Sequence, residues 1–210
     1  MAWTKRNPIL LVGIPHTGHV TMEWALAFRQ LSIPFPHLYS FVRGVPIDRA
    51  RNQLVETMLE KGCEWLFFLD SDVIVPPNTI EKLMAHKQPI ISALYYRRYP
   101  PYNPSMWKLA EHPKPEGKYS PIMSFPKGEI VEADVIGMGA CLIHRRVFEK
   151  LEPPWFKWTQ GWEKGGVSED FYFCEKAKEK GFRLLVDTSI VCKHVVEGLI
   201  YEGQITSFSV

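Results

Sequence analysis

The sequence predicts an α/β fold in which helices cover both faces of a mostly parallel sheet. Three observations lead to this prediction. Patterns typical of buried strands and amphipathic helices alternate at short spacing through residues 8–94, as in sheets with helical crossovers. The run at residues 65–69 is apolar throughout and is followed by two acids, which indicates a buried strand with a polar end. The 210 residues, 46% hydrophobic and 23% charged, suffice for one compact core.

The elements of the first half follow from local patterns in chain order. A short apolar run starts the regular part of the chain, and a turn at residues 15–18 ends this run. Residues 48–60 place apolar side chains on one helical face, and Gly62 closes that helix. A proline pair at residues 76–77 ends the acid-bearing strand and opens the next helix. The expected strands are 8–14, 35–42, 65–69 and 89–94, and the expected helices are 20–31, 48–60 and 77–86.

The second half begins with a break in this pattern. Residues 95–127 are rich in proline, aromatic and basic side chains and show little periodicity, which predicts a long functional loop. Strand character returns at residues 129–144, where the small residues at 137–140 allow a backbone or a ligand to approach closely. The later elements expected are helices at 145–151 and 168–181, a loop at 152–167, and strands at 183–187 and 189–195.

Composition restricts the class of protein. The net charge of +2 is too small to indicate nucleic-acid binding by itself. No apolar stretch approaches the ~20 residues of a transmembrane helix, and the N-terminus lacks a signal-peptide pattern, so we expect a cytoplasmic protein. The four cysteines form no C-x-x-C pair, which favours buried free thiols. With no repeat or linker in the sequence, residues 1–210 are expected to form a single domain.

The segment Asp70-Ser71-Asp72 is the strongest functional signal. Its two carboxylates follow a buried strand, and open α/β sheets bind their ligands at the carboxyl ends of such strands. Two acids one residue apart repel each other unless a cation lies between them. Mg²⁺ or Mn²⁺ suits these hard oxygen ligands and can carry a diphosphate. A solvated turn that caps the next helix is the competing interpretation of these three residues alone.

Four motifs in order resemble those of nucleotide-sugar glycosyltransferases with the GT-A fold, in particular small family 2-like members. The motifs are the Arg-containing helix start at 49–52, the D-x-D strand at 67–72, the glycine-bearing strand and helix start at 137–148, and the E-D motif at 168–171, followed by a closing strand with His194. The resemblance implies a Rossmann-like GT-A domain. Its donor-binding half would span about 8–94, and a smaller, antiparallel acceptor-side half about 95–195.

This resemblance also implies an activity. A metal-dependent enzyme of this kind moves one sugar from a nucleoside-diphosphate sugar, here a UDP- or GDP-sugar, to an acceptor hydroxyl. Asp70, Asp72 and His194 would hold Mn²⁺ or Mg²⁺, which stabilises the departing diphosphate. Asp170 would be the general base if the reaction inverts the anomeric configuration, with Glu169 as the next candidate. A retaining reaction needs no such base, and the pair would then bind substrate hydroxyls.

Substrate-binding residues are expected on several loops around these acids. The expected donor contacts are Pro15, His16, Thr17, Arg51, Asp70, Ser71 and Asp72. The expected acceptor contacts are Tyr102, Trp107, Gly139 and Trp158. Aromatic faces stack well on sugar rings, and Arg97, Arg98 and Lys108 suit an acidic acceptor. A glycan or a lipid-linked sugar is the leading expectation, whereas a base in DNA is disfavoured by the near-neutral charge.

Other readings of the same motifs stay open. A haloacid-dehalogenase-type phosphohydrolase also uses an apolar strand followed by D-x-D, but Ile74 stands where that group has Thr or Val. A non-catalytic nucleotide- or sugar-binding module would not need both D-x-D and E-D. A nucleotidyltransferase would want a basic, glycine-rich phosphate loop after the first strand, and the turn at 15–18 contains no Lys or Arg. The Q-x-x-R-W motif of processive family members is absent, which favours transfer of single sugars.

Overall fold

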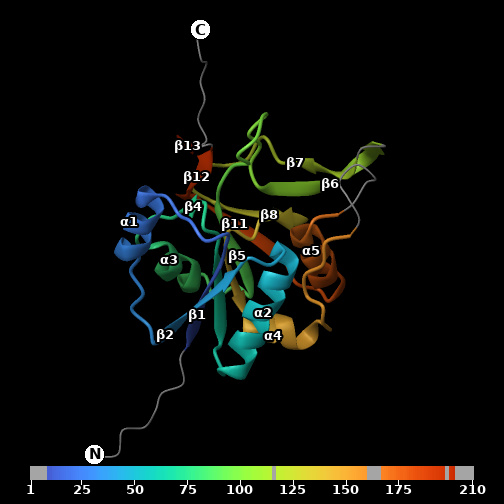
Figure 1. The fold of residues 1–210 in the computed structure, drawn as a ribbon. Coiled ribbons are helices and arrows are strands. Elements are labelled where there is room, and N and C mark those ends of the chain that lie inside the picture. The colour runs from blue at the N-terminus through green and yellow to red at the C-terminus, as the bar shows by residue number, and fades with distance from the viewer. Residues whose placement is uncertain (1–8, 115–116, 160–166, 197–198, 202–210) are drawn as a thin grey trace, which may run out of the picture.

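The computed structural model describes residues 9–114, 117–159, 167–196 and 199–201. Its main sheet contains β1 (Leu10–His16), β2 (His37–Arg43), β3 (Trp65–Leu69), β5 (Ile90–Leu94), β8 (Ile130–Ala133), β10 (Ala140–His144) and β11 (Leu184–Val191). The strand order is β2-β1-β3-β10-β5-β11-β8 (Figure 1). Strands β2, β1, β3, β5 and β11 share one direction, and β10 and β8 run against them. The predicted mostly parallel α/β sheet is confirmed.

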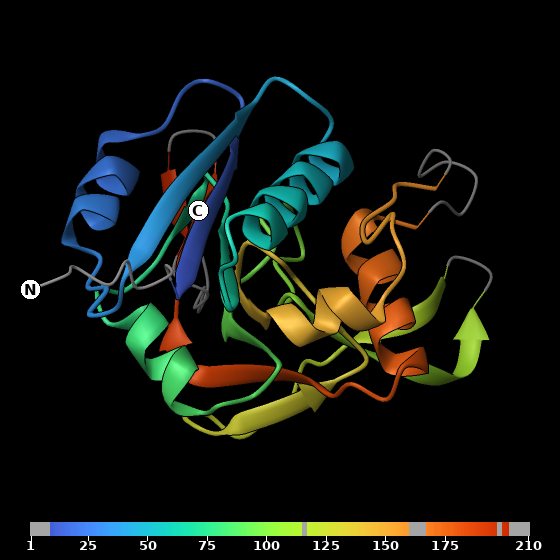
Figure 2. The same ribbon diagram turned by 90° about the horizontal axis from the view of Figure 1, so that it is seen from below.

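Helices cover both faces of this sheet, as the sequence predicts. They are α1 (Met22–Gln30), α2 (Ile47–Glu60), α3 (Thr79–Ala85), α4 (Arg145–Lys150) and α5 (Glu169–Glu179). Figure 2 shows α1 and α3 on one side of the sheet and α2, α4 and α5 on the other. Because side chains alternate along a strand, Phe67 and Leu69 join the core beneath α1 and α3, whereas Leu66 and Phe68 join the core beneath the other three helices.

Two small antiparallel sheets complete the fold. One joins β4 (Val73–Ile74), β12 (Lys193–Val196) and β13 (Leu199–Tyr201), and the other joins β6 (Met106–Lys114), β7 (Gly117–Pro121) and β9 (Val135–Ile136). Both lie at the upper side of the molecule in Figure 1. The β6–β7 hairpin corrects the prediction of an irregular segment at 95–127. Strand β6 pairs with β7 and with β9, which is distant in sequence. These pairings stabilise strands whose residues show no clear alternation of apolar and polar side chains.

The cysteine prediction is confirmed, because all four thiols are buried and free. In the described part of the chain, no helix is both long and apolar enough to span a bilayer. The two strands expected at 183–187 and 189–195 are instead β11, which extends to Val191, and β12, which follows it. The pairing of β12 with β4 matters for the site, because it sets His194 directly opposite Val73.

Candidate active site

Backbone contacts fix the acid-bearing segment after β3. The backbone N–H of Asp70 donates to the carbonyl of Gly139 at 2.9 Å, and the indole N–H of Trp24 donates to the carbonyl of Asp70 at 3.0 Å. On the other side, the N–H of Val195 donates to the carbonyl of Asp72 at 2.9 Å. The two acids therefore lie between β10 and β12, at the carboxyl end of β3. This is the edge at which open α/β sheets bind ligands.

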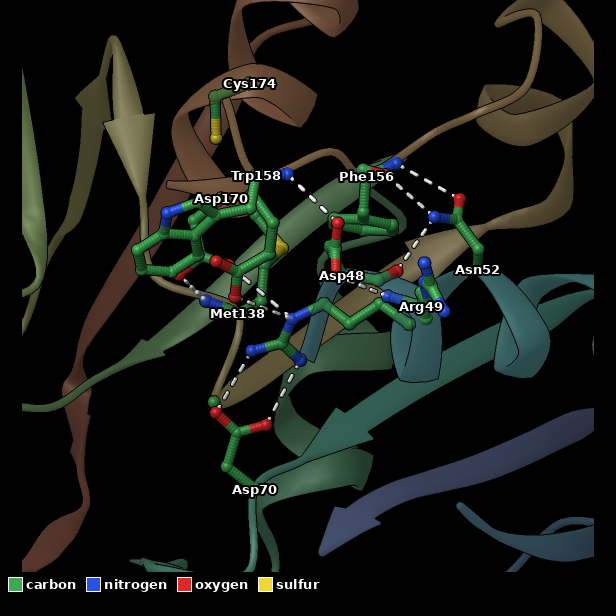
Figure 3. Close-up of polar contacts among 12 residues, drawn as sticks. Asp48, Arg49, Asn52, Asp70, Met138, Phe156, Trp158, Asp170 and Cys174 are labelled. Carbon is green, nitrogen blue, oxygen red and sulfur yellow. Dashed lines mark hydrogen bonds and ion pairs between the residues drawn. The ribbon is translucent and has the colours of Figure 1, made fainter. Parts of the chain in front are cut away.

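Arg51 from α2 forms the centre of a buried ionic cluster. Its side chain is only 2% exposed, and its two terminal nitrogens each bind one carboxylate oxygen of Asp70 at 3.1 Å. Its Nε lies 3.3 Å from Oε1 of Glu169 and 3.6 Å from Oδ1 of Asp170, the first two residues of α5. Figure 3 shows the forked contact between this guanidinium and Asp70. The structure therefore brings three of the predicted acids onto one cation.

This cluster contains three carboxyl groups and one guanidinium. The excess of negative charge makes it harder to ionise the carboxyl groups. Burial raises the pKa of Asp70, although the charge of Arg51 partly opposes this. Burial and the charge of Glu169 raise the pKa of Asp170 well above its ordinary value. Oδ2 of Asp170 accepts from the N–H of Met138 at 3.2 Å. Oδ1 is buried and, among the described residues, accepts no hydrogen bond. This oxygen also lies 3.6 Å from Nε of Arg51, so the guanidinium is a close charged neighbour. A carboxylate of raised pKa is a stronger proton acceptor than an ordinary one.

Asp72 belongs to a second, more exposed group. Its Oδ2 lies 2.8 Å from Nη1 of Arg98 and 3.5 Å from Nε2 of His194. Burial raises the pKa of Asp72, but the hydrogen bond and charge of His194 and the charge of Arg98 outweigh it, so the net pKa is lowered. The pKa of Asp72 is therefore shifted in the opposite direction to that of Asp170. The contact with Arg98 was not predicted, because only the basic character of that stretch is visible in the sequence.

His194 is oriented by a backbone carbonyl. Its Nδ1 lies 2.7 Å from the carbonyl oxygen of Tyr96. Since a carbonyl only accepts, Nδ1 carries the proton and Nε2 faces Asp72. A backbone contact of this kind fixes the tautomer of metal-binding histidines. Burial lowers the pKa of His194, but the contacts with Asp72 and Tyr96 outweigh it and raise the net value.

These contacts test the predicted metal site. Among the described residues, no three His, Cys, Asp or Glu side chains are grouped to hold an ion. Arg51 engages both oxygens of Asp70, and the role of Asp70 as a direct ligand stays a prediction. Asp72 and His194 still fit: atoms 3.5 Å apart can both lie about 2.1 Å from one ion, and Mg²⁺ often takes one or two protein ligands beside phosphates and water. The predicted metal site of Asp70, Asp72 and His194 stays a prediction, and the geometry favours Asp72 and His194 within it.

The predicted donor contacts divide into two groups. Strand β1 pairs with β3 up to Gly13 and Phe68, so Pro15 and His16 continue past that pairing on the side of Asp70. Pro15 is buried, His16 half-buried and Thr17 exposed, and Ser71 is half-buried in the turn between the acids. The predicted contact of Arg51 with the donor diphosphate stays a prediction, and the surroundings of Arg51 in this structure do not favour it. Arg51 is buried and its charge is committed to carboxylates, which leaves no exposed face for a diphosphate.

Trp158 is placed by contacts that the sequence did not reveal. Its backbone N–H donates to Oδ2 of Asp48 at 3.2 Å, and its side chain remains 43% exposed. The Asn52 amide binds the backbone of Phe156 in both directions, at 2.7 and 3.2 Å. In Figure 3 the indole of Trp158 points toward the cluster that contains Asp170. Asp48 and Asn52, in the first turns of α2, thus fix the backbone of the segment that contains Phe156 and Trp158. Residues 160–166 of the predicted loop lie outside the described part of the chain.

The other predicted acceptor residues have different surroundings. Tyr102 has a positive φ of 55° in the turn after β5. Trp107 lies on β6 with its ring 5.1 Å from that of Phe171, so part of its surface serves packing. At Gly139, an added Cβ would lie 2.9 Å from Cγ2 of Val73, 3.1 Å from the hydroxyl oxygen of Tyr95 and 3.2 Å from Oδ2 of Asp70. Glycine there is explained by this close approach, and an acceptor contact by Gly139 stays a prediction.

Comparison with known proteins adds to this geometry. The Anp1 family model matches residues 42–113, less than half of the chain. Among solved structures, A197 from STIV is similar with a TM-score of 0.62 and 18% identity, over 96% of this chain and 97% of that chain. TarS 1–349 from S. aureus, in complex with UDP-GlcNAc, is similar with a TM-score of 0.50 and 11% identity, over 84% of this chain and 55% of that chain. At these identities the two likenesses show a shared fold. A comparison with curated sequences gave no match.

Proposed function

We propose that this protein is a metal-dependent glycosyltransferase that moves one sugar from a nucleoside-diphosphate sugar to an acceptor hydroxyl. The observation that carries the proposal is a pair of acidic groups with opposed environments at one sheet edge. The pKa of Asp72 is lowered beside His194, whereas the pKa of Asp170 is raised and its Oδ1 accepts no hydrogen bond from the described residues. When the environments of two carboxylates shift their pKa values in opposite directions, one can serve as an ionised ligand and the other as a proton acceptor.

The charged side of the site would bind the donor. Asp72 and His194 would hold Mn²⁺ or Mg²⁺, which neutralises charge on the departing diphosphate when it is bound. The Tyr96 carbonyl keeps Nε2 of His194 directed at this position. Pro15, His16 and Thr17 would contact the nucleoside. Support for a nucleotide-sugar donor comes from the likeness to TarS, which was solved with UDP-GlcNAc, and from the Anp1 match, a mannosyltransferase-related family.

The buried side of the site would activate the acceptor. The carboxylate of Asp170, whose side chain is 20% exposed, would take the proton of the acceptor hydroxyl. The hydroxyl oxygen would attack the anomeric carbon as the bond to the diphosphate breaks. This assignment requires an inverting reaction. Arg51 holds Asp170, Glu169 and Asp70 in fixed positions. Trp158, directed toward the same cluster, offers an aromatic face to a sugar acceptor.

The phosphohydrolase alternative fits these contacts poorly. In that chemistry the first acid of D-x-D is a nucleophile, and a nucleophile needs a free oxygen. Both oxygens of Asp70 are bound by the guanidinium of Arg51, which is itself buried. A non-catalytic binding module would share the donor contacts but would have no use for a proton acceptor at Asp170.

Donor binding is expected to raise the melting temperature in a metal-dependent way. A ligand at 100 times its Kd stabilises a protein by about 2.7 kcal/mol, and each kcal/mol shifts the Tm of a domain this size by about 2–4 °C. UDP-sugars or GDP-sugars with Mn²⁺ should therefore raise Tm by roughly 5–10 °C, measured by thermal shift across both nucleotide series.

Matched variants sharpen that measurement. Asp72→Asn should remove the part of the shift that depends on Mn²⁺, whereas Asp170→Asn should retain it, because Asp170 contacts the acceptor rather than the diphosphate. A shift of equal size with EDTA would contradict the metal assignment. The absence of a shift with every UDP- and GDP-sugar would contradict the donor class.

A further inference from the structure

Arg98 occupies the outer side of the candidate metal position. Its guanidinium lies 2.8 Å from Oδ2 of Asp72, the oxygen that also faces His194 at 3.5 Å. The side chain is 45% exposed, and its guanidinium lies 5.1 Å from the centre of the Tyr99 ring. Arg98 therefore rests at the rim of the site with a single carboxylate contact. In this respect it differs from Arg51, which is buried and holds Asp70 through two hydrogen bonds.

The segment that carries Arg98 is anchored at its base rather than at its tip. The backbone N–H of Arg97 donates to the carbonyl of Asn103 at 2.9 Å, and Tyr96 forms an isolated bridge with Pro104. Within the turn, the N–H of Tyr102 donates to the carbonyl of Tyr99 at 2.9 Å. These bonds fix the backbone of the turn near Asp72, so the Arg98 side chain can change partners without movement of the turn.

Arg98 and a divalent cation compete for the same oxygen. An ion held by Oδ2 of Asp72 and Nε2 of His194 would lie within a few ångströms of the guanidinium, and like charges at that separation repel. The exposed partner of such a pair is the one that moves, because single surface ion pairs contribute little to stability. A displaced guanidinium beside a metal-bound diphosphate then meets phosphate oxygens, which its planar fork binds well.

We propose that Arg98 is an exchangeable counter-ion of Asp72. In the ligand-free protein it neutralises this carboxylate; when Asp72 and His194 take a divalent cation it leaves Asp72 and binds the diphosphate that accompanies the ion. This inference rests on the proposed function, since it needs a diphosphate ligand. It adds a donor-binding residue to the site and couples cation binding to the turn that contains Tyr102.

If Arg98 exchanges partners in this way, the substitution Arg98→Gln should strengthen the binding of Mn²⁺ alone and weaken the binding of nucleotide. In Arg98→Gln, Mn²⁺ alone should bind roughly two- to fivefold more tightly, because a competing surface charge is gone. UDP or GDP in saturating Mn²⁺ should bind about tenfold more weakly, because a charge-assisted hydrogen bond to phosphate is lost. Mn²⁺ binding is measured by electron paramagnetic resonance, and nucleotide binding by calorimetry. Arg97→Gln is the matched control, since it removes the same charge from the neighbouring residue.

The results of these binding measurements distinguish a failure of the Arg98 exchange from a failure of the proposed glycosyltransferase function. If the wild type binds Mn²⁺ and nucleotide but Arg98→Gln behaves like Arg97→Gln, the exchange is overturned and the proposed function stands. A weaker affinity for Mn²⁺ alone in Arg98→Gln would likewise overturn it. Tighter Mn²⁺ binding with unchanged nucleotide binding would overturn the phosphate contact. If the wild type binds neither Mn²⁺ nor nucleotide, the proposed function and the exchange both fail.

Discussion

Asp170→Asn is expected to lower turnover by about 10²–10⁴-fold, the usual effect of losing a general base, while donor binding is retained. The reason is that the Asp170 carboxylate, whose pKa is raised, would accept the proton of the acceptor hydroxyl, whereas the amide of asparagine cannot. Turnover is measured as nucleoside-diphosphate release, and donor binding as the thermal shift. Glu169→Gln should have a smaller effect, since Glu169 is held by Arg51.

The same substitution is expected to stabilise the fold. The pKa of Asp170 is raised above its unfolded value by burial and by the charges of Glu169 and Asp70, which outweigh Arg51. A group of this kind contributes its full stability below the unfolded pKa and loses it as the pH rises through the folded pKa. Asparagine carries no proton to lose, so its advantage in Tm should grow with pH. The difference in Tm between Asp170→Asn and the wild type, measured by thermal unfolding across pH, should therefore increase from acidic to alkaline buffer.

Two results would contradict the assignment of Asp170 as the general base, and a third would contradict its raised pKa. An inverted product made at the wild-type rate by Asp170→Asn would place the base elsewhere, with Glu169 as the next candidate. A product of retained configuration, identified by NMR, would remove the need for any base. A decrease in the Tm of Asp170→Asn at alkaline pH would contradict the raised pKa.

Arg51→Gln is expected to have the largest effect on stability. Its guanidinium is the charge that offsets Asp70, Glu169 and Asp170 in the buried cluster. Removing one partner of a buried ion pair typically costs about 3–5 kcal/mol, because the remaining charge has no compensation. The corresponding loss in Tm is roughly 6–20 °C for a domain of this size. Chemical denaturation gives the free energy of unfolding directly.

Arg49→Gln is the matched control for this measurement, because Arg49 is an exposed residue on the same helix. Its effect should lie within about 0.5 kcal/mol of zero, as for most surface substitutions. If Arg51→Gln is too unstable to purify, Arg51→Lys should recover part of the stability by keeping a cation in the cluster. An Arg51→Gln protein that unfolds at the same denaturant concentration as Arg49→Gln would show that the acids do not depend on Arg51.

Local sequence patterns predicted the parts of the fold that local forces determine. The apolar run of β3 and the acids after it appear where expected, because continuous apolar residues indicate a buried strand. Ser168 and the acids that follow begin α5, as the helix dipole favours. The resemblance to GT-A glycosyltransferases leads to a further expectation. The acids of the D-x-D and E-D motifs, far apart in sequence, are expected to meet at one edge of the main sheet.

Long-range contacts account for what the sequence did not reveal. The two-residue strand β4 exists because β12 pairs with it, and nothing in Val73 or Ile74 indicates that partner. The same holds for Arg51: an arginine on an amphipathic helix predicts a surface position, and its burial follows from the approach of β3 and α5. Arg98 meets Asp72 only because the turn after β5 folds back over the sheet edge. A single sequence contains no local signal for such contacts.

The most direct test of the proposed activity is the release of nucleoside diphosphate from a panel of UDP- and GDP-sugars. With Mn²⁺, the wild type should release nucleoside diphosphate from at least one donor, slowly even without an acceptor, by transfer to water. EDTA should stop this release, and Asp72→Asn should lack it while its unfolding in the absence of metal remains cooperative. Release that continues at the same rate in EDTA, or no release from any sugar nucleotide by folded wild-type protein, would contradict a metal-dependent glycosyltransferase.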